Sequence, residues 1–326
     1  MTILDVKNLT KTFPIGAGFV GKSQSVKAIR GVSFSISQGE TLGLVGESGC
    51  GKSTLGRCIL RLMEPTTGRI MFKGRDLCSL SASQMRKARC DMQIIFQDPY
   101  ASLNPRMRVG DIVQEGLDIH DLRPKAQRKD RAIQLLEDVG LKAEHFQSYP
   151  HEFSGGQRQR IGIARALAVN PQFLVADEAV SALDVSIQAQ ILNLLMDLQS
   201  RLKLTYHFIS HNLHVVRHVS DRVAVMYLGK IVEIASSDDI YQRPSHPYTQ
   251  ALLSAALLPD PDKGGARTKL QGDVPSPINP PRGCAFHTRC LLADGHCREQ
   301  DPELFYVDQH GVACHKAGIL RPTFGA

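Results

Sequence analysis

Short apolar runs and stretches with helical spacing alternate along this chain. The runs predict strands at residues 3–6, 32–36, 41–45, 68–74, 173–176 and 205–210. Between the last two runs, one face of a predicted helix carries Ile187, Ile191, Leu194, Leu195 and Leu198. Strands that alternate with helices indicate an α/β core built around a parallel sheet.

Two changes of pattern suggest how the chain is divided. Residues 98–170 are mostly helical in pattern and are expected to form an insertion in the core. Residues 14–21 are expected to form a flexible connection. Six of the 17 prolines fall between 259 and 281, which indicates a linker to a separate tail. The predicted domains are therefore 1–250 and 251–326.

Composition narrows the class of protein. A chain of 326 residues with 42% hydrophobic and 22% charged residues is typical of a globular protein. Its net charge of +7 suits an anionic partner, but basic runs interleaved with aromatic residues are lacking and Trp is absent, so no nucleic-acid partner is expected. The start of the chain lacks a secretory signal pattern, and the apolar stretch 251–258 is too short to cross a membrane. A cytosolic protein is expected.

A complete phosphate-binding loop follows the apolar run at 41–45 and precedes a predicted helix. It consists of Gly46, Glu47, Ser48, Gly49, Cys50, Gly51, Lys52, Ser53 and Thr54. The glycines allow backbone N–H groups to surround phosphates at a helix N-terminus. Lys52 would reach the β- and γ-phosphates, and the Ser53 hydroxyl would bind Mg²⁺. The strand–loop–helix setting excludes a glycine-rich hairpin, so the chain is expected to bind ATP or a related nucleotide.

Two further motifs are weaker when taken alone. The apolar run 173–176 ends in Asp177, which could hold Mg²⁺ through water, and Glu178, which could orient or deprotonate an attacking water. Many buried strands simply end in acidic turns. Residues 154–157 (Ser-Gly-Gly-Gln) open a predicted helix and could bind an anion, or Ser154 could simply cap the helix.

The order of all these motifs resembles the ATP-binding-cassette (ABC) superfamily over residues 1 to about 250. The resemblance implies a P-loop α/β core with an N-terminal antiparallel β subdomain, an inserted helical subdomain and a small Cys-rich C-terminal extension. It also implies a head-to-tail dimer of cassettes around two ATP molecules. The residues that it places at the nucleotide are Phe13 (on adenine), Gln97 (on Mg²⁺ and water), Ser154, Gly155, Gly156 and Gln157 (on the partner's γ-phosphate), Asp184 (between the two sites) and His211 (on the γ-phosphate). Phe13 could instead be a core residue, since its local motif is loose.

The chain departs from the family pattern near these motifs. Ala179 and Val180 follow Glu178 where the family has Pro-Thr, which could loosen the placement of Glu178. Asn212 replaces the usual aspartate after His211, and Phe153 replaces a leucine before the signature motif. ATPase activity is expected to survive these changes.

The tail, with its motifs at 246–253 and 275–290, resembles the C-terminal extension of oligopeptide and dipeptide importer ATPases, in particular the second ATPase of a dipeptide permease. This resemblance implies a peripheral protein on the cytoplasmic face of the inner membrane. Its expected partners are a second homologous ATPase, two transmembrane permease subunits and, indirectly, a periplasmic binding protein. Residues 98–106 would receive the permease coupling helices. Nickel and glutathione importers share the extension, so the cargo stays open. A DNA-repair or ribosome-associated ABC protein is disfavoured by the single cassette.

Four of the eight cysteines lie close together in the tail, at Cys284, Cys290, Cys297 and Cys314. Such a loop-rich segment is a candidate for metal-driven folding, because it has few core-forming residues. The spacing lacks the tight cysteine pair that structural zinc favours, whereas four thiolates suit an iron–sulfur cluster. The subfamily resemblance also points to a [4Fe–4S] cluster. Zinc, with help from His287, His296 or His315, and unligated buried thiols are the alternatives.

Overall fold

The computed structural model describes residues 1–15, 24–256 and 272–317. Most of the predicted connection at 14–21 and the first part of the predicted linker from 259 lie outside these residues. The chain forms two compact units. The loop unit contains residues 2–36, 41–78 and 210–317 as far as they are described, and the helical unit contains residue 1 and residues 37–40 and 79–209. The predicted division near residue 250 stays a prediction.

The first sheet of the loop unit is antiparallel and four-stranded, in the order β2-β1-β4-β5. It consists of β1 (Thr2–Ile15), β2 (Gln24–Ser37), β4 (Thr67–Phe72) and β5 (Arg75–Asp76). Leu4 pairs with Phe72 and Val6 with Ile70 across β1 and β4, and all four side chains are buried. Alternating apolar residues thus face one side of the sheet. This is the predicted N-terminal antiparallel β subdomain.

The second set of strands in the loop unit runs in the order β11-β12-β10-β9-β3. Its members are β3 (Thr41–Val45), β9 (Arg222–Tyr227), β10 (Lys230–Ser236), β11 (Phe305–Val307) and β12 (His310–Val312). β3 and β9 are parallel, whereas β10 pairs antiparallel with both β9 and β12. The end of the chain therefore adds strands directly to the sheet that contains β3.

Five helices belong to the loop unit. They are α1 (Lys52–Ile59), α7 (Leu213–Val219), α8 (Ser237–Gln242), α9 (Pro247–Ala256) and α10 (Gly295–Glu299). β3 is buried at all five positions, and α1 follows it after six residues. The predicted strand–loop–helix order is confirmed.

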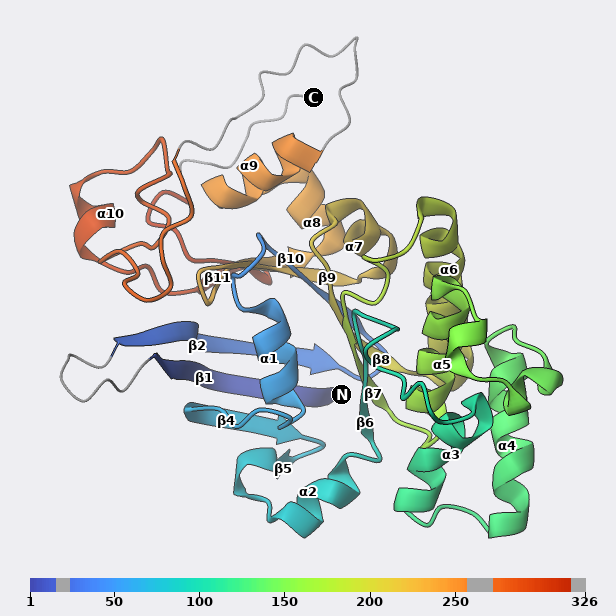
Figure 1. The fold of residues 1–326 in the computed structure, drawn as a ribbon. Coiled ribbons are helices and arrows are strands. Elements are labelled where there is room, and N and C mark those ends of the chain that lie inside the picture. The colour runs from blue at the N-terminus through green and yellow to red at the C-terminus, as the bar shows by residue number, and fades with distance from the viewer. Residues whose placement is uncertain (16–23, 257–271, 318–326) are drawn as a thin grey trace. The chain divides into compact units, whose positions relative to one another are not determined.

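The helical unit contains the parallel strands β6 (Met92–Ile95), β7 (Phe173–Asp177) and β8 (Thr205–Ile209). Its α-helices are α2 (Ala82–Ala88), α3 (Val109–Ile119), α4 (Lys125–Asp138), α5 (Gly155–Leu167) and α6 (Val185–Leu202). Helices α3, α4 and α5 pack against one another (Figure 1) and form the predicted helical block. Helix α6 buries Ile191, Leu195 and Leu198 of the predicted face, whereas Ile187 and Leu194 are half-buried and Leu192 is buried as well.

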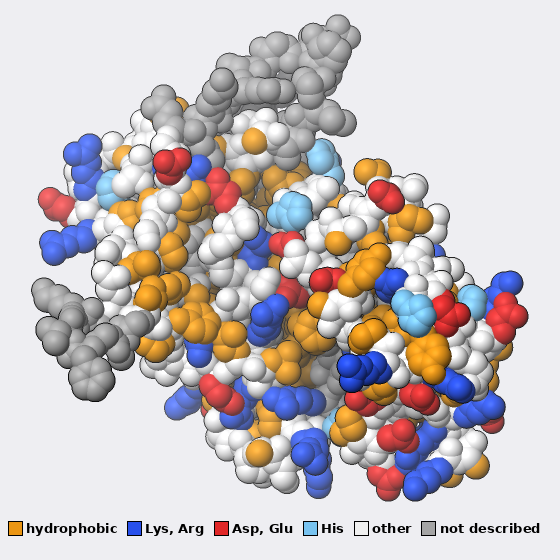
Figure 2. All heavy atoms as spheres, viewed as in Figure 1, with side chains coloured by type: hydrophobic (Ala, Val, Ile, Leu, Met, Phe, Trp, Pro, Cys, Tyr) orange, Lys and Arg blue, Asp and Glu red, His pale blue; other side chains and the backbone are white. Residues whose placement is uncertain are grey.

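Two observations bear on the expected surroundings of the chain. No helix within residues 1–15, 24–256 and 272–317 is long and apolar enough to cross a membrane. On the face drawn in Figure 2, basic and acidic side chains occur side by side.

Candidate functional site

The phosphate loop joins β3 to α1 through a tight turn. Gly51 precedes α1 with φ 108°, and a Cβ atom there would lie 2.3 Å from the Ala28 carbonyl oxygen. Only glycine fits this position, because both the backbone angle and the neighbouring strand exclude a side chain. No side chain caps α1, so the N–H groups of its first turn face the loop. Exposed N–H groups at a helix start are the geometry that favours anion binding.

Lys52 lies inside the loop rather than in solvent. Its side chain is buried, and Nζ donates to the Gly46 carbonyl at 2.7 Å and to the Glu47 carbonyl at 3.1 Å. These bonds hold the ammonium group at the centre of the turn. Ser53 and Thr54 follow it in the first turn of α1 and are half-buried. Burial raises the pKa of the neighbouring Cys50 thiol, which favours its neutral form.

Two further predicted nucleotide residues belong to the loop unit. Ser210 N–H donates to the Leu44 carbonyl at 3.1 Å, which places the exposed His211 beside the end of β3. Asn212 caps α7, because its side chain accepts from His214 N–H at 3.0 Å and Val215 N–H at 3.4 Å. The departure from aspartate therefore keeps the cap. Phe13 is only half-buried in β1, with Lys11 Nζ 5.0 Å from its ring centroid, so the structure does not place it in the core.

Glu178 and Gln97 meet in the helical unit. Gln97 Nε2 donates to Glu178 Oε2 at 2.9 Å. Glu178 has a left-handed backbone (φ 49°), and its carbonyl oxygen accepts from both N–H and Oγ of Ser181 at 3.0 Å. Asp177 is the buried last residue of β7. A strand end and a hydrogen-bonded turn thus hold the two carboxylates.

The turn after Glu178 is well packed despite its departure from the family pattern. Ala179 and Val180 are 1% and 3% exposed, and Glu178 N–H donates to the Ile209 carbonyl at 3.0 Å. These contacts fix the main chain on both sides of the carboxylate, which is the task that proline would perform in the family pattern.

The signature motif opens α5 and packs against the start of α6. Ser154 caps α5 by accepting from Gln157 N–H at 3.4 Å, and Ser154 N–H donates to Gln157 Oε1 at 3.0 Å. The capping alternative is therefore present, and it leaves the first-turn N–H groups oriented outward. A Cβ atom on Gly156 would lie 2.5 Å from Ile187 Cγ2. Ile187 stands three residues after the exposed Asp184, so the signature motif and the aspartate loop are adjacent.

The four tail cysteines line one small cavity. Cys284, Cys290, Cys297 and Cys314 all border it, together with His246, His287 and His315. Burial, with a smaller contribution from the neighbouring cysteines, raises the pKa values of Cys284 and Cys314 to about 11. Backbone N–H groups oppose this rise, because those of Phe286, Leu292 and Lys316 donate to the sulfurs of Cys284, Cys290 and Cys314.

A single metal ion finds no ready site in the part of the chain that the structure describes, because no group of three or more His, Cys, Asp or Glu side chains there is arranged to hold one. His287 Nδ1 lies 2.9 Å from the Cys284 carbonyl, and His315 Nε2 lies 3.0 Å from the Gln300 carbonyl. One ring nitrogen of each histidine is therefore engaged by backbone. The cysteines are close neighbours without forming a compact site for one ion.

Comparisons with known proteins identify the family. A model of the ABC transporter family matches residues 29–181, and a model of the oligopeptide/dipeptide transporter C-terminal region matches residues 232–297. The chain is 54% identical over 321 residues to the oligopeptide transport ATP-binding protein AppF of Bacillus subtilis (strain 168), covering 96% of this chain and 97% of that protein. The chain belongs to the ATP-binding proteins of the oligopeptide/dipeptide ABC transporter family.

Other similarities agree with this family. The di/tripeptide transport ATP-binding protein DppF of Pseudomonas aeruginosa (strain UCBPP-PA14) is 51% identical over 318 residues, with 97% of this chain and 98% of that protein covered. Among solved structures, the dimeric ATP-binding cassette MJ0796, in a post-hydrolysis state with ADP and Pi, aligns with a TM-score of 0.64 and 29% identity. That alignment covers 72% of this chain and 98% of MJ0796. The chain is thus an ABC ATPase with an added extension.

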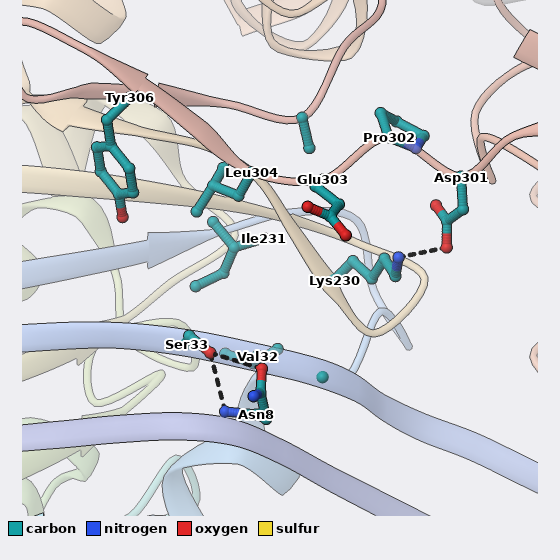
Figure 3. Close-up of a pocket in the computed structure, with 12 residues that line it drawn as sticks. Asn8, Val32, Ser33, Lys230, Ile231, Asp301, Pro302, Glu303, Leu304 and Tyr306 are labelled. Atoms are coloured by element: carbon teal, nitrogen blue, oxygen red, sulfur yellow. Dashed lines mark hydrogen bonds and ion pairs between the residues drawn. The ribbon is translucent and has the colours of Figure 1, made fainter.

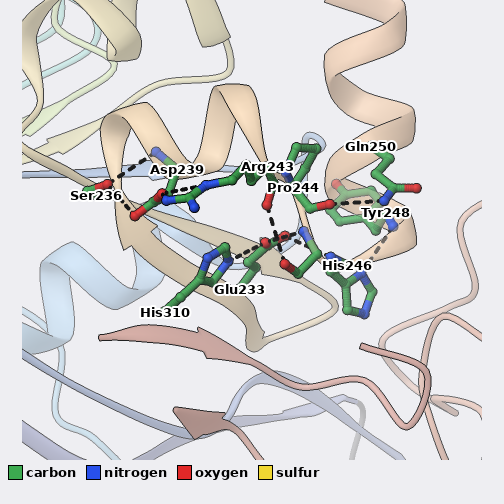
Figure 4. A network of polar contacts seen from close by, with 10 residues as sticks. Glu233, Ser236, Asp239, Arg243, Pro244, His246, Tyr248, Gln250 and His310 are labelled. Carbon is green, nitrogen blue, oxygen red and sulfur yellow. Dashed lines mark hydrogen bonds and ion pairs between the residues drawn. The ribbon is translucent and has the colours of Figure 1, made fainter. Parts of the chain in front are cut away.

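A buried carboxylate anchors the extension of this ABC ATPase. Glu233 of β10 is 0% exposed and accepts from Ser245 N–H at 2.6 Å and His246 N–H at 3.0 Å (Figure 4). His310 Nε2, from β12, lies 2.7 Å from Oε1, the oxygen that also accepts from Ser245 N–H. One carboxylate thus ties together β10, the approach to α9 and β12. Burial lowers the pKa of His246 to about 4, so its ring is neutral near pH 7, and Nδ1 accepts from Tyr248 N–H at 3.0 Å.

A separate cavity of about 550 Å³ lies between the antiparallel sheet and the residues that lead into β11 (Figure 3). Asn8 and Ser33 line one wall, and Lys230, paired with Asp301, lines the other. None of its lining residues, all of which the structure describes, belongs to a predicted motif. The cavity is distinct from the phosphate loop.

Sequence reasoning missed three residues that connect the extension to the cassette: Glu233, Tyr248 and Arg289. Tyr248 and Arg289 stand inside the motifs that carry the family resemblance, but neither motif reveals what the side chain contacts. Glu233 is an isolated acid in an apolar strand, and that isolation was the available signal.

Proposed function

We propose that this chain is the ATPase subunit of a peptide importer, bound to the cytoplasmic face of the inner membrane. The extension carries this proposal. It matches the oligopeptide/dipeptide transporter C-terminal region, and relatives named for oligopeptide and di/tripeptide transport align along nearly the whole chain. A general cassette such as MJ0796 aligns with only 72% of the chain. The extension is therefore the part that favours peptides as cargo.

In the proposed reaction, Lys52 and the N–H groups at the start of α1 bind the phosphates of ATP. Glu178 accepts a proton from the attacking water, and its hydrogen bond with Gln97 orients the carboxylate toward that water. His211 contacts the γ-phosphate. Fixed charges and hydrogen-bond donors of this kind stabilise the charge on the transferred phosphoryl group.

The residues proposed for Mg²⁺ offer the donors that this ion prefers. Ser53 supplies a hydroxyl, Asp177 a carboxylate and Gln97 an amide oxygen, and hard oxygen donors suit Mg²⁺. When bound, Mg²⁺ would neutralise charge on the phosphoryl group.

A second, homologous ATPase would complete each nucleotide site. The signature motif, residues 154–157, would bind the γ-phosphate held by that partner, because the first-turn N–H groups of α5 are oriented outward. Asp184, adjacent to the signature motif through Ile187, would transmit the state of one site to the other.

Two permease subunits would dock near residues 98–106. Tyr100 in this segment is 63% exposed, and the Arg158 guanidinium lies 3.9 Å from the centre of its ring. Leu103 is buried and Arg165 donates to the Ser102 carbonyl at 2.5 Å. These contacts hold in place the segment that carries the exposed Tyr100 ring. A periplasmic binding protein would act indirectly, through the permeases.

Affinity purification of the tagged chain from its own membrane, followed by mass spectrometry, tests the assembly. We expect two permease subunits and a second ATPase at equal amounts. The Tyr100→Asp variant should lose the permeases and keep ATP binding, because it places a charge on the docking surface. A preparation that contains ribosomes or DNA-repair proteins instead would refute the importer.

We also propose that the four tail cysteines hold a [4Fe–4S] cluster. The thiols line one cavity, and backbone N–H groups donate to three of the sulfurs. Such bonds stabilise thiolates and are found around cluster sulfurs. Each thiolate of a cluster binds a different iron, so the four need not converge on one ion. Zinc would require a compact tetrahedral set.

Anaerobic purification with iron, sulfide and zinc analysis tests the cluster. We expect about four irons and four sulfides per chain and a brown colour, because each cysteine would ligate one iron. Cys290→Ser should lower both contents and bleach the protein, whereas Cys90→Ser, in the cassette, should not. A colourless protein with one zinc per chain would refute the cluster.

A further inference from the structure

Glu47 of the phosphate loop is bound by the Cys-rich extension. Arg289 Nη1 donates to Glu47 Oε2 at 2.8 Å, and Nη2 donates to Oε1 at 3.1 Å. The Arg289 side chain is 7% exposed and that of Glu47 26%. The two residues are 242 positions apart in the chain. This is a parallel, two-bond contact between a guanidinium and a carboxylate, the geometry in which Arg is most specific.

Helix α9, which precedes the extension, also holds the main chain of Glu47. The Tyr248 hydroxyl oxygen accepts from Glu47 N–H at 2.9 Å, and Tyr248 is fully buried. Its ring centroid lies 4.7 Å from that of Tyr227 and 5.4 Å from that of Phe286. Both the backbone and the side chain of this loop residue are therefore fixed from outside the loop.

Arg289 is itself held by the turn between two of the tail cysteines. His287 N–H donates to the Cys284 carbonyl at 3.0 Å, and Arg289 N–H donates to the Phe286 carbonyl at 3.0 Å. Cys290 follows directly. The guanidinium position thus depends on the fold of the Cys-rich turn.

Glu47, which Arg289 contacts, is hydrogen-bonded to Lys52, the residue proposed to bind phosphate. The Glu47 carbonyl accepts from Lys52 Nζ at 3.1 Å and from Cys50 N–H at 3.3 Å. A carboxylate in a phosphate loop would repel a triphosphate, since like charges oppose each other most where water is partly excluded. Arg289 cancels that charge and fixes the peptide that Lys52 contacts.

We propose that Arg289 is a positioning residue of the phosphate loop, which makes ATP affinity depend on the Cys-rich extension. The proposal goes beyond the importer function: it requires that the loop bind ATP, but not that the cargo be a peptide or that a cluster be present.

Binding of a fluorescent ATP analogue with Mg²⁺ to the full-length chain tests the proposal. Arg289→Gln should raise Kd roughly tenfold, equivalent to about 1.4 kcal/mol, because the compensation of the Glu47 charge is lost. Arg289→Lys keeps the charge but loses the paired geometry, so a rise of about threefold is expected. Arg282→Gln, an exposed arginine of the same segment, is the matched control and should bind as wild type.

A charge-rescue variant separates positioning from general stability. Glu47→Gln/Arg289→Gln removes both charges, so it should bind ATP more tightly than Arg289→Gln. Its melting temperature should be no higher than that of Arg289→Gln. In the assembled complex, Arg289→Gln should raise KM for ATP and leave kcat nearly unchanged. Wild-type affinity in Arg289→Gln, or an equal loss in the double variant, would overturn the proposal. If Arg289→Gln does not fold, Arg289→Lys decides: an unchanged Kd would overturn the proposal.

Discussion

The phosphate loop and the C-terminal extension reach ordered structure in different ways. The loop is short and lies between a fully buried strand, β3, and the helix α1. The extension, residues 272–317, has one helix of five residues and two strands of three, and depends on contacts such as Glu233 with His310. Regular elements place the first region, whereas individual polar side chains place the second. Single substitutions should therefore damage function in the loop and stability in the extension.

The largest effect is expected in the loop. Lys52→Ala should lower the rate of ATP hydrolysis by the assembled complex at least about 100-fold, because one fixed positive charge at the phosphates is lost. The melting temperature should change little, since the Lys52 bonds lie within the loop itself. Steady-state hydrolysis and thermal unfolding check both parts. Lys87→Ala, an exposed lysine in α2, is the control, and similar rates for the two variants would contradict the comparison.

The second effect concerns the stability of the extension. Glu233→Gln should lower the free energy of unfolding by about 2–3 kcal/mol, because a buried ion with three partners loses its charge and one acceptor. Urea unfolding of the purified chain measures this. Glu303→Gln, at an exposed position of the extension, should be neutral. If both variants unfold at the same urea concentration, the network does not anchor the extension.

Tyr248 contacts the phosphate loop, and loss of its hydroxyl oxygen should moderately lower both the ATP affinity and the stability of the chain. Tyr248→Phe removes the hydroxyl that accepts from Glu47 N–H and leaves that donor without a partner. We expect a loss of about 1–2 kcal/mol in stability and weaker ATP binding. Tyr306→Phe, at a ring 53% exposed, serves as the control. A Tyr248→Phe chain with wild-type ATP affinity would show that the main-chain contact does not matter for the loop.

The smallest effect is expected at the cap of α7. Asn212→Ala should cost about 1 kcal/mol, because two N–H groups of the first turn lose their acceptor. Asn212→Asp keeps the acceptor and restores the residue usual in the family, so its cost should be a few tenths of a kcal/mol. Differential scanning calorimetry resolves this difference. Equal losses in both variants would mean that the cap does not stabilise the helix.

The parts of the fold that follow local rules were predictable from the sequence. The strand at 41–45, the loop that follows it and the acid-terminated strand 173–177 are each defined by a run of neighbouring residues. The helix at 185–202 was also predicted. Of its predicted apolar face, Ile187 and Leu194 are only half-buried, whereas Leu192 is buried, because tertiary packing and not spacing alone decides which side of a wide apolar face is covered.

The long-range contacts were not predictable. Glu47 was assigned to the nucleotide because it lies within the loop motif, yet its carboxylate binds Arg289, 242 residues away. The hairpin of β9 and β10 was missed although its two apolar runs flank Gly229 at the turn, whereas the three-residue strands β11 and β12 gave no clear sequence pattern. Short strands have too few positions to show a period, and their pairing is decided by partners distant in the chain.

Peptide uptake by cells that lack the native chain tests the central claim most directly. Cells complemented with wild type should accumulate a labelled di- or oligopeptide, and cells with Glu178→Gln should not, although the variant protein still binds ATP. Glu152→Gln, an exposed acid ahead of the signature motif, is the matched control. Uptake that survives Glu178→Gln, or that wild type fails to restore, would contradict a peptide importer driven by this ATPase.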